Sequence, residues 1–287
     1  MLIVADIILA FYFAFNKIYQ KSEGTSMAAG FKFNALSGLF TLIIFLILNG
    51  FSTKITVFSC ILALGKTVFV VAYTLLGFRL LKEGTMALYT LFLMIGGMTV
   101  PYIYGLAFLG EEFSWLRTFA LIVILLGVGI ANFDKGKMNG KMLLMCIGVF
   151  ILNGFVSVIS KIHQLETYSR VAVGANGFII IGAFIQFVIC GICYLATKKN
   201  VHGKSQKPLS TIALIGIVVL ASAMNGFSYL LQLEGASKLP ATVIYPVVTG
   251  GSIVFSSLVG IVAFKERPSL KVIISVCLCF VGTLMFL

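Results

Sequence analysis

Long apolar stretches alternate with short polar breaks along the whole chain. A helix of about 20 apolar residues can cross the hydrocarbon core of a bilayer, and the pattern predicts ten such helices. The predicted spans are Leu2–Phe15, Met27–Leu48, Val57–Phe78, Met86–Leu109, Trp115–Phe133, Met142–Ile162, Val171–Thr197, Ile212–Leu233, Ala241–Phe264 and Leu270–Leu287. The longest break, 198–210, is short and basic, which leaves no soluble domain. The pattern therefore predicts an all-α membrane protein.

Composition agrees with a chain that lies in lipid. Hydrophobic residues make up 60% of the sequence and charged residues only 10%, whereas soluble domains carry about 25% charged residues. The first span has no basic leader and no small-residue cleavage site, so it is not expected to be a signal peptide. We therefore expect a multi-pass integral membrane protein, located in the cell membrane.

The chain contains an internal repeat. The stretch from Ala87 to Leu116 aligns without a gap with the stretch from Ala241 to Leu270, so that Gly96-Gly97 matches Gly250-Gly251 and Glu112 matches Glu266. A second echo pairs residues 17–20 with residues 161–164. Because five spans separate equivalent positions, the two copies are predicted to be inverted in the membrane. We expect two five-helix repeats, 1–134 and 140–287, an architecture typical of carriers that work by alternating access.

Basic residues are divided unevenly between the loops. The loops after the odd-numbered spans hold fourteen of them: Lys17, Lys21, Arg79, Lys82, Lys135, Lys137, Lys141, Lys198, Lys199, Lys204, Lys207, Lys265, Arg267 and Lys271. The other loops hold five: Lys54, Arg117, Lys161, Arg170 and Lys238. The positive-inside rule then predicts cytoplasmic odd-numbered loops and both termini outside. The net charge of +12 thus indicates topology and contact with anionic headgroups, and nucleic-acid binding is not expected.

The repeated residues also carry a family resemblance. The stretch from Ala241 to Leu284, with Tyr245-Pro246-Val247, Gly250-Gly251, Phe264-Lys265-Glu266 and Gly282, resembles the second EamA domain of the drug/metabolite transporter superfamily. The stretch from Ala87 to Gly129, with Glu112 and Gly127, is similar to the end of the first EamA domain, except that Phe92 stands where the second copy has Pro246.

The resemblance covers the whole chain and implies a carrier, without naming its substrate. Many members of the superfamily are described with both termini in the cytoplasm. The charge count of this chain predicts the opposite orientation and is more like that of the sugar-uptake branches.

Lys66 is the most informative candidate for a binding residue. It falls near the middle of the third predicted span, roughly 15 Å from water at 1.5 Å per residue. A charge at this depth costs a few kcal/mol, so Lys66 should face a cavity, a partner charge or an anionic ligand. The alternative is a structural pair with a carboxylate or with helix-end carbonyls.

Two further charges lie inside predicted spans. Asp6 is the acid that lies deepest in an apolar run; it could accept a coupling proton, pair with Lys66, or sit at the outer interface. Lys32 lies about a turn and a half into the second span and could face the cavity or reach the cytoplasmic headgroups. We expect Glu83, Glu112, Glu234 and Glu266, which fall at span ends, to be caps or loop ion pairs.

Uncharged polar side chains within the spans complete the candidate set. Each needs a partner across a helix interface or in a cavity, and the family resemblance implies that their spans surround a central cavity. The predicted substrate-binding residues are Lys66, Tyr73, Tyr89, Asn153, Asn225, Tyr229 and Tyr245.

No cofactor, metal site or catalytic group is expected. Cys190 and Cys193 have the spacing of a metal clamp, but Cys277 and Cys279 lie at a different predicted depth, and the chain has two histidines, His163 and His202. Without an ATP-binding motif a primary pump is excluded. We expect a secondary carrier of a small polar or anionic metabolite, as a monomer or homodimer; the alternative is a non-catalytic component that moves or holds a lipid-linked molecule.

Overall fold

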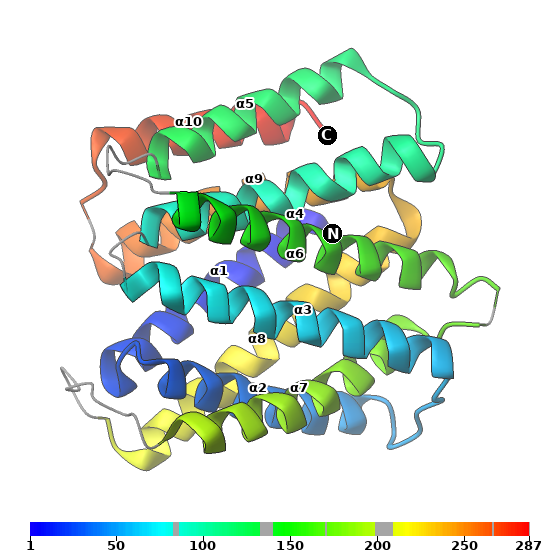
Figure 1. The fold of residues 1–287 in the computed structure, drawn as a ribbon, viewed down its shortest axis with the longest axis vertical. Coiled ribbons are helices and arrows are strands. Elements are labelled where there is room, and N and C mark those ends of the chain that lie inside the picture. Colours follow the sequence, from blue (N-terminus) through cyan, green and yellow to red (C-terminus); the bar gives the residue numbers. More distant parts are fainter. Residues whose placement is uncertain (83–85, 133–139, 170, 199–208, 266, 287) are drawn as a thin grey trace.

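The fold is a bundle of ten helices. The computed structural model describes residues 1–82, 86–132, 140–169, 171–198, 209–265 and 267–286, and these residues contain no strand. The helices are α1 (Leu2–Glu23), α2 (Met27–Leu48), α3 (Val57–Lys82), α4 (Met86–Phe108), α5 (Trp115–Asn132), α6 (Gly140–Leu165), α7 (Ala175–Thr197), α8 (Thr211–Lys238), α9 (Ala241–Phe264) and α10 (Leu270–Leu284) (Figure 1). The prediction of an all-α protein with ten helices is confirmed.

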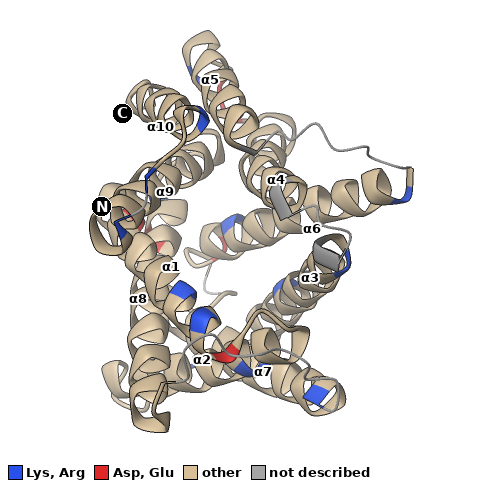
Figure 2. Ribbon diagram, turned by 90° about the vertical axis from the view of Figure 1, so that its left-hand side faces the viewer, with Lys and Arg blue, Asp and Glu red and all other residues tan. Residues whose placement is uncertain are grey.

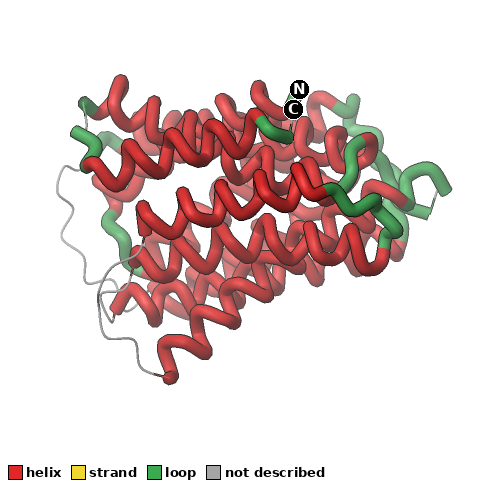
Figure 3. The backbone as a smooth tube through the Cα atoms, turned by 90° about the horizontal axis from the view of Figure 1, so that it is seen from above, coloured by secondary structure: helices red, strands yellow, loops and turns green. Residues whose placement is uncertain are grey.

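Most of these helices are long enough to cross a bilayer. Eight of those in the described residues meet the length and hydropathy of a membrane span, whereas α5 and α10 are shorter apolar helices. Because lipid offers no hydrogen bonds, a spanning segment must satisfy its backbone internally, as a helix does. The helices run side by side with their connections gathered at the two ends (Figure 3). Large apolar side chains such as Ile212 and Leu144 are exposed on the outside, where lipid would cover them.

The first helix is longer than the apolar pattern predicts. We expected it to end at Phe15, yet α1 continues through polar residues to Glu23. Nothing between these positions breaks a helix until Gly24, whose φ of 84° lies in the left-handed region that glycine adopts without strain. Ser26 then begins α2, where its side chain accepts a hydrogen bond from the Ala29 amide at 3.2 Å. Hydropathy marks the part of a helix that lies in lipid, and glycine marks its end.

The packing follows the pairing of the two halves. Within the bundle α2 packs against α7, α4 against α9 and α5 against α10, each against the helix five places away in the chain. Two further sets of contacts match, since α1 packs against α8 and α9 while α6 packs against α3 and α4. Figure 2 shows α9, α1 and α8 along one side of the bundle and α4, α6 and α3 along the other, with α2 and α7 at one end and α5 and α10 at the opposite end.

Glycines allow the closest of these helix crossings. A Cβ atom at Gly38 of α2 would lie 2.8 Å from the Phe187 backbone nitrogen of α7. At Gly96 of α4 it would collide with the backbone of Phe150 of α6. Small residues at such positions are the usual means by which membrane helices approach each other.

Candidate functional site

Lys66 of α3 lies among side chains from α6, α7 and α8. Its Nζ atom is 3.5 Å from the centroid of the Tyr229 ring and 5.8 Å from the centroid of the Phe178 ring. A cation above the face of an aromatic ring is attracted by the negative charge of that face. Within the described part of the chain Lys66 makes no ion pair. The Lys66 site, which we define as Lys66, Tyr229, Phe178 and Ser160, therefore presents a positive charge on an aromatic surface.

The Tyr229 ring is held in place from the opposite side of the bundle. Its hydroxyl lies 2.9 Å from Oγ of Ser160 on α6, and Ser160 in turn donates to the Val156 carbonyl at 3.0 Å. Because the serine proton is used in that bond, the tyrosine hydroxyl donates and the serine oxygen accepts. The bond fixes the ring so that its face, rather than its polar edge, meets Lys66.

The Phe178 ring is held by a buried histidine. His163 stacks on Phe178 with ring centroids 3.7 Å apart and an interplanar angle of 20°. Its Nε2 lies 2.8 Å from Oγ of Ser59, and its Nδ1 lies 3.0 Å from Nε2 of Gln164. An amide nitrogen can only donate, so Nδ1 accepts and Nε2 carries the proton. This neutral form supports the ring without adding a second charge beside Lys66.

A polar stripe on α6 links the site to the neighbouring helices. Asn153 donates to the Leu93 carbonyl of α4 at 2.7 Å, and Ser157 donates to the Gly97 carbonyl at 3.1 Å. The Tyr245 hydroxyl of α9 donates to the Ser157 carbonyl at 2.6 Å. Asn153 and Tyr245 thus serve as helix-to-helix contacts in this structure. Ser157 and Ser160 were not predicted, although their spacing from Asn153, four and seven residues on, marks one helix face.

The other predicted residues are divided between two places. Asn225 lies one turn before Tyr229 on the same face of α8 and makes no hydrogen bond within the described residues. Tyr73 and Tyr89 instead pack around a buried cluster that includes Leu80 and Met145. Tyr73 is two turns along α3 from Lys66, roughly 10 Å, which places these tyrosines towards the far end of the bundle.

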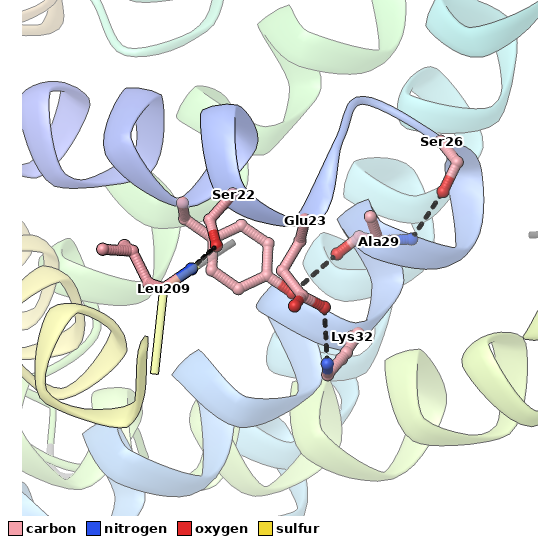
Figure 4. A network of polar contacts seen from close by, with 7 residues as sticks. Ser22, Glu23, Ser26, Ala29, Lys32 and Leu209 are labelled. Atoms are coloured by element: carbon pink, nitrogen blue, oxygen red, sulfur yellow. Dashed lines mark hydrogen bonds and ion pairs between the residues drawn. The ribbon is translucent and has the colours of Figure 1, made fainter. Parts of the chain in front are cut away.

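Lys32 forms an ion pair instead of joining the Lys66 site. Its Nζ lies 2.6 Å from Oε2 of Glu23 at the end of α1 (Figure 4). In the same network Ser22 accepts a hydrogen bond from the Leu209 amide at 3.1 Å, which ties the end of α1 to the segment before α8. The charge of Lys32 is therefore compensated locally, where the loops begin.

Two charges hold the turn between α8 and α9. Lys161 of α6 donates to the Ala236 and Leu239 carbonyls at 2.7 and 2.6 Å. Glu111 accepts hydrogen bonds from the Ala241 and Thr242 amides at 2.5 and 2.8 Å, and so caps α9.

Four acids at span ends were expected to cap helices or to form loop ion pairs, and the structure shows such a pair for one of them. Glu234 pairs with Lys238 at 3.9 Å, an ion pair as expected. Glu83 and Glu266 lie outside the described residues, and Glu112 makes no ion pair within them. Sequence reasoning selected Glu112 because the repeat aligns it with Glu266, yet its neighbour Glu111 reaches α9.

Asp6 lies away from Lys66, on the opposite side of the bundle. It sits where α1 packs against α9, with only 1% of the residue exposed. Neither of its carboxylate oxygens has a hydrogen-bond partner among the described residues. Asp6 thus forms no ion pair with Lys66 in this arrangement, which was one of the expected alternatives. All six cysteines are free, and no group of three or more His, Cys, Asp or Glu side chains in the described residues could hold a metal ion.

Comparison with known proteins agrees with this architecture. Residues 140–287 match the EamA-like transporter family. A solved structure described only as a crystal structure of protein is similar over 99% of this chain and 94% of its own, with a TM-score of 0.74 and 16% sequence identity. At that identity the likeness shows a shared fold. Comparison with curated proteins gives no match.

Proposed function

The chain belongs to the EamA-like transporter family, and from this premise we propose that it is a secondary carrier of a small polar or anionic metabolite, which binds at the Lys66 site. The observation that carries the proposal is an ammonium at membrane depth that lies over an aromatic face and pairs with no carboxylate of the described residues. The family membership makes the chain a multi-pass membrane transporter of the drug/metabolite transporter superfamily. The substrate class and the site are our proposal.

The energetics of Lys66 favour an anionic ligand. A lysine at the centre of a membrane helix costs about 2.5–3.5 kcal/mol, and a cation–π contact returns about 0.5–2 kcal/mol. The contact with Tyr229 thus offsets part of the free-energy cost of placing the lysine in the membrane, and it leaves the ammonium able to bind an anion. A carboxylate or phosphate group would offset the remainder by a charge-assisted hydrogen bond. Asn225, one turn away on α8, is placed to contact the uncharged part of the same ligand.

Alternating access is supported by a pair of equivalent lysines, Lys161 at one end of the bundle and Lys17 at the other. The end that holds the α8–α9 turn is tied by Lys161 and Glu111. At the other end Lys17, the repeat equivalent of Lys161, lies over the Phe264 ring at 4.9 Å beside a gap of about 80 Å³. We propose that residues 1–134 and 140–287 are inverted repeats that exchange these two arrangements. The paired helix contacts support that division.

A groove between α9 and α10 supports the alternative function. It has a volume of about 530 Å³ and faces outward, with Arg267 near one end and mostly apolar residues along it, among them Ile261, Val272 and Val276. An apolar groove with a cation at its end suits a lipid tail with an anionic headgroup. A protein that moves or holds a lipid-linked molecule would use this groove in place of the Lys66 site.

Uptake by purified protein in liposomes separates the two functions. Radiolabelled anionic, neutral and cationic metabolites would be tested in counterflow with wild type, Lys66→Met and, as a control at an exposed ion pair, Lys238→Met. We expect one or more anionic compounds to enter with wild type and Lys238→Met only. Uptake that Lys66→Met retains would refute the site, and translocation of a fluorescent anionic lipid without metabolite uptake would establish the alternative.

A further inference from the structure

A buried acid occupies a close contact between α1 and α9. A Cβ atom at Gly251 of α9 would collide with Oδ2 of Asp6, so the carboxyl group fills the space that this glycine leaves. Both carboxylate oxygens are buried and have no hydrogen-bond partner in the described residues. A charged, unpartnered carboxylate in such a place costs several kcal/mol, whereas a protonated one is neutral. The packing therefore suits the protonated form of Asp6.

No opposite charge faces Asp6 from the helices around it. α9 contains no charged residue, and the charges of α8 are Glu234 and Lys238, which pair with each other at its exposed end. The phenols of α8 and α9 face elsewhere, since Tyr229 binds Ser160 and Tyr245 binds Ser157.

The charges of α1 itself are also engaged away from Asp6. Lys17 and Lys21 lie over the Phe264 ring, and Glu23 pairs with Lys32. The amino group of Met1 stands at the start of the helix, more than a turn away from Asp6.

A gap lies in the same contact of α1 with α9, on the Lys17 side of Asp6, and begins one helical turn away from it at Ala10. It is lined on α1 by Ala10, Ala14 and Lys17, and on α9 by Ser256 and Gly260. Ala10 lies one helical turn from Asp6 on the same face. The volume of about 80 Å³ exceeds the roughly 30 Å³ that one water molecule occupies in the liquid. Water in this gap would come within one turn of the carboxyl group.

A short chain of contacts joins Asp6 to the Lys66 site. Ser228 of α8 donates to the Ala5 carbonyl at 2.8 Å. The next residue on α8 is Tyr229, whose ring lies under the Lys66 ammonium. A change in the packing of α1 would thus displace α8, the helix whose Tyr229 ring lies under Lys66.

We propose that Asp6 is a proton-binding site that couples proton movement to the carrier cycle, an inference whose coupling part rests on the proposed function. When the contact loosens on its Lys17 side, a hydronium ion from the gap reaches Asp6; one of its O–H bonds breaks as an O–H bond forms on the carboxylate, a water molecule is left, and the neutral group packs against Gly251. When α1 and α9 separate, water reaches the carboxyl group from the opposite side, takes the proton and leaves a hydrated carboxylate. The proton thus crosses the membrane together with the conformational change. A charged Asp6 opposes closure of the α1–α9 contact, because closure would remove water from the carboxylate.

The proton site is tested without any substrate. Infrared spectra of wild type, Asp6→Asn and the control Glu234→Gln in liposomes at several pH values would detect the carbonyl band of a protonated carboxylic acid. We expect the band at neutral pH in wild type and Glu234→Gln, its loss at high pH, and its absence in Asp6→Asn. Gly251→Ala should shift the band, because the added methyl presses on the carboxyl group, whereas Gly97→Ala at the equivalent contact should leave it unchanged. A wild-type spectrum without the band would overturn the proposal.

Coupling is tested with a metabolite that wild type carries. An imposed pH gradient should drive accumulation of this metabolite by wild type. Asp6→Asn should accumulate about tenfold less than wild type, whereas its counterflow rate at equal pH on both sides should stay within about twofold of the wild-type rate. Accumulation that Asp6→Asn retains would overturn the coupling. If no variant carries any metabolite but the infrared band is present, the proton site stands and the proposed function fails.

Discussion

The contact of α4 with α6 and the contact of α1 with α9 are equivalent in the repeat but differ in their polar groups. Gly96 and Gly97 of α4 both face α6, whereas in the second contact Gly251 faces Asp6 of α1 and Gly250 faces α5 and α10. In the first contact Asn153 and Ser157 donate to backbone carbonyls of α4. In the second, Asp6 is buried without a partner. A glycine allows a close approach in both places, but the first contact has hydrogen-bonded polar groups and the second has a group that can change its charge.

The largest expected effect tests the contact of α4 with α6. Gly96→Ala places a methyl group on the backbone of Phe150, which cannot move aside as a side chain can, so we expect a loss of about 3 kcal/mol of stability. Gly251→Ala meets the Asp6 carboxyl group, which can rotate, and should cost less than half of this. Thermal unfolding in detergent would compare the two variants. Equal losses would mean that the two contacts do not differ in rigidity.

Removal of the Lys66 charge tests whether α3, which packs against α6, carries the binding site. Lys66→Met keeps most of the apolar stem and should reduce uptake of an anionic metabolite about a hundredfold, which corresponds to the loss of one charge-assisted contact of roughly 2.7 kcal/mol. Lys66→Arg should retain part of the activity. Initial rates at equal protein levels in liposomes provide the measurement. A variant that folds normally and transports like wild type would assign Lys66 a structural role.

The dependence of stability on pH should separate the two contacts. The packed α1–α9 contact admits a neutral Asp6, and unfolding lets the group ionise, so raising the pH should favour unfolding with a slope of up to about 1.4 kcal/mol per pH unit for one proton. Asp6→Asn should remove this contribution. Asn153→Leu should instead lower stability by about 1–2 kcal/mol at every pH, because its hydrogen bond carries no charge. Identical pH profiles for wild type and Asp6→Asn would argue against a protonated Asp6.

The smallest effect should come from the support of the Tyr229 ring. Tyr229→Phe keeps the aromatic face under Lys66 and removes the hydroxyl bond to Ser160, so we expect about 1 kcal/mol of lost stability and a severalfold weaker apparent affinity. Ser160→Ala should behave in the same way. A double variant no worse than either single one would confirm that the two residues act through one bond.

The predicted helices and the predicted site were accessible to sequence reasoning to different degrees. All ten helices appear near the expected positions, because each depends on a local run of apolar residues. Lys66 and Tyr229, both predicted as site residues, lie in contact. Phe178 gave no signal, since phenylalanine occurs 26 times in the chain. Ser160 could have been found from its helical spacing with Asn153. Tyr73 and Tyr89 share the chemistry of Tyr229, and only the packing separates them from it.

By itself the sequence determined the helices, their apolar exterior and the presence of charges at membrane depth, because insertion into lipid depends on local hydropathy and on hydrogen bonds within each helix. Only the tertiary structure decided which charges are compensated. Lys32 meets Glu23, Lys161 meets helix-end carbonyls, and Lys66 meets an aromatic face. Asp6 meets a glycine. The partners come mostly from helices far apart in the chain, and their approach depends on how the helices cross.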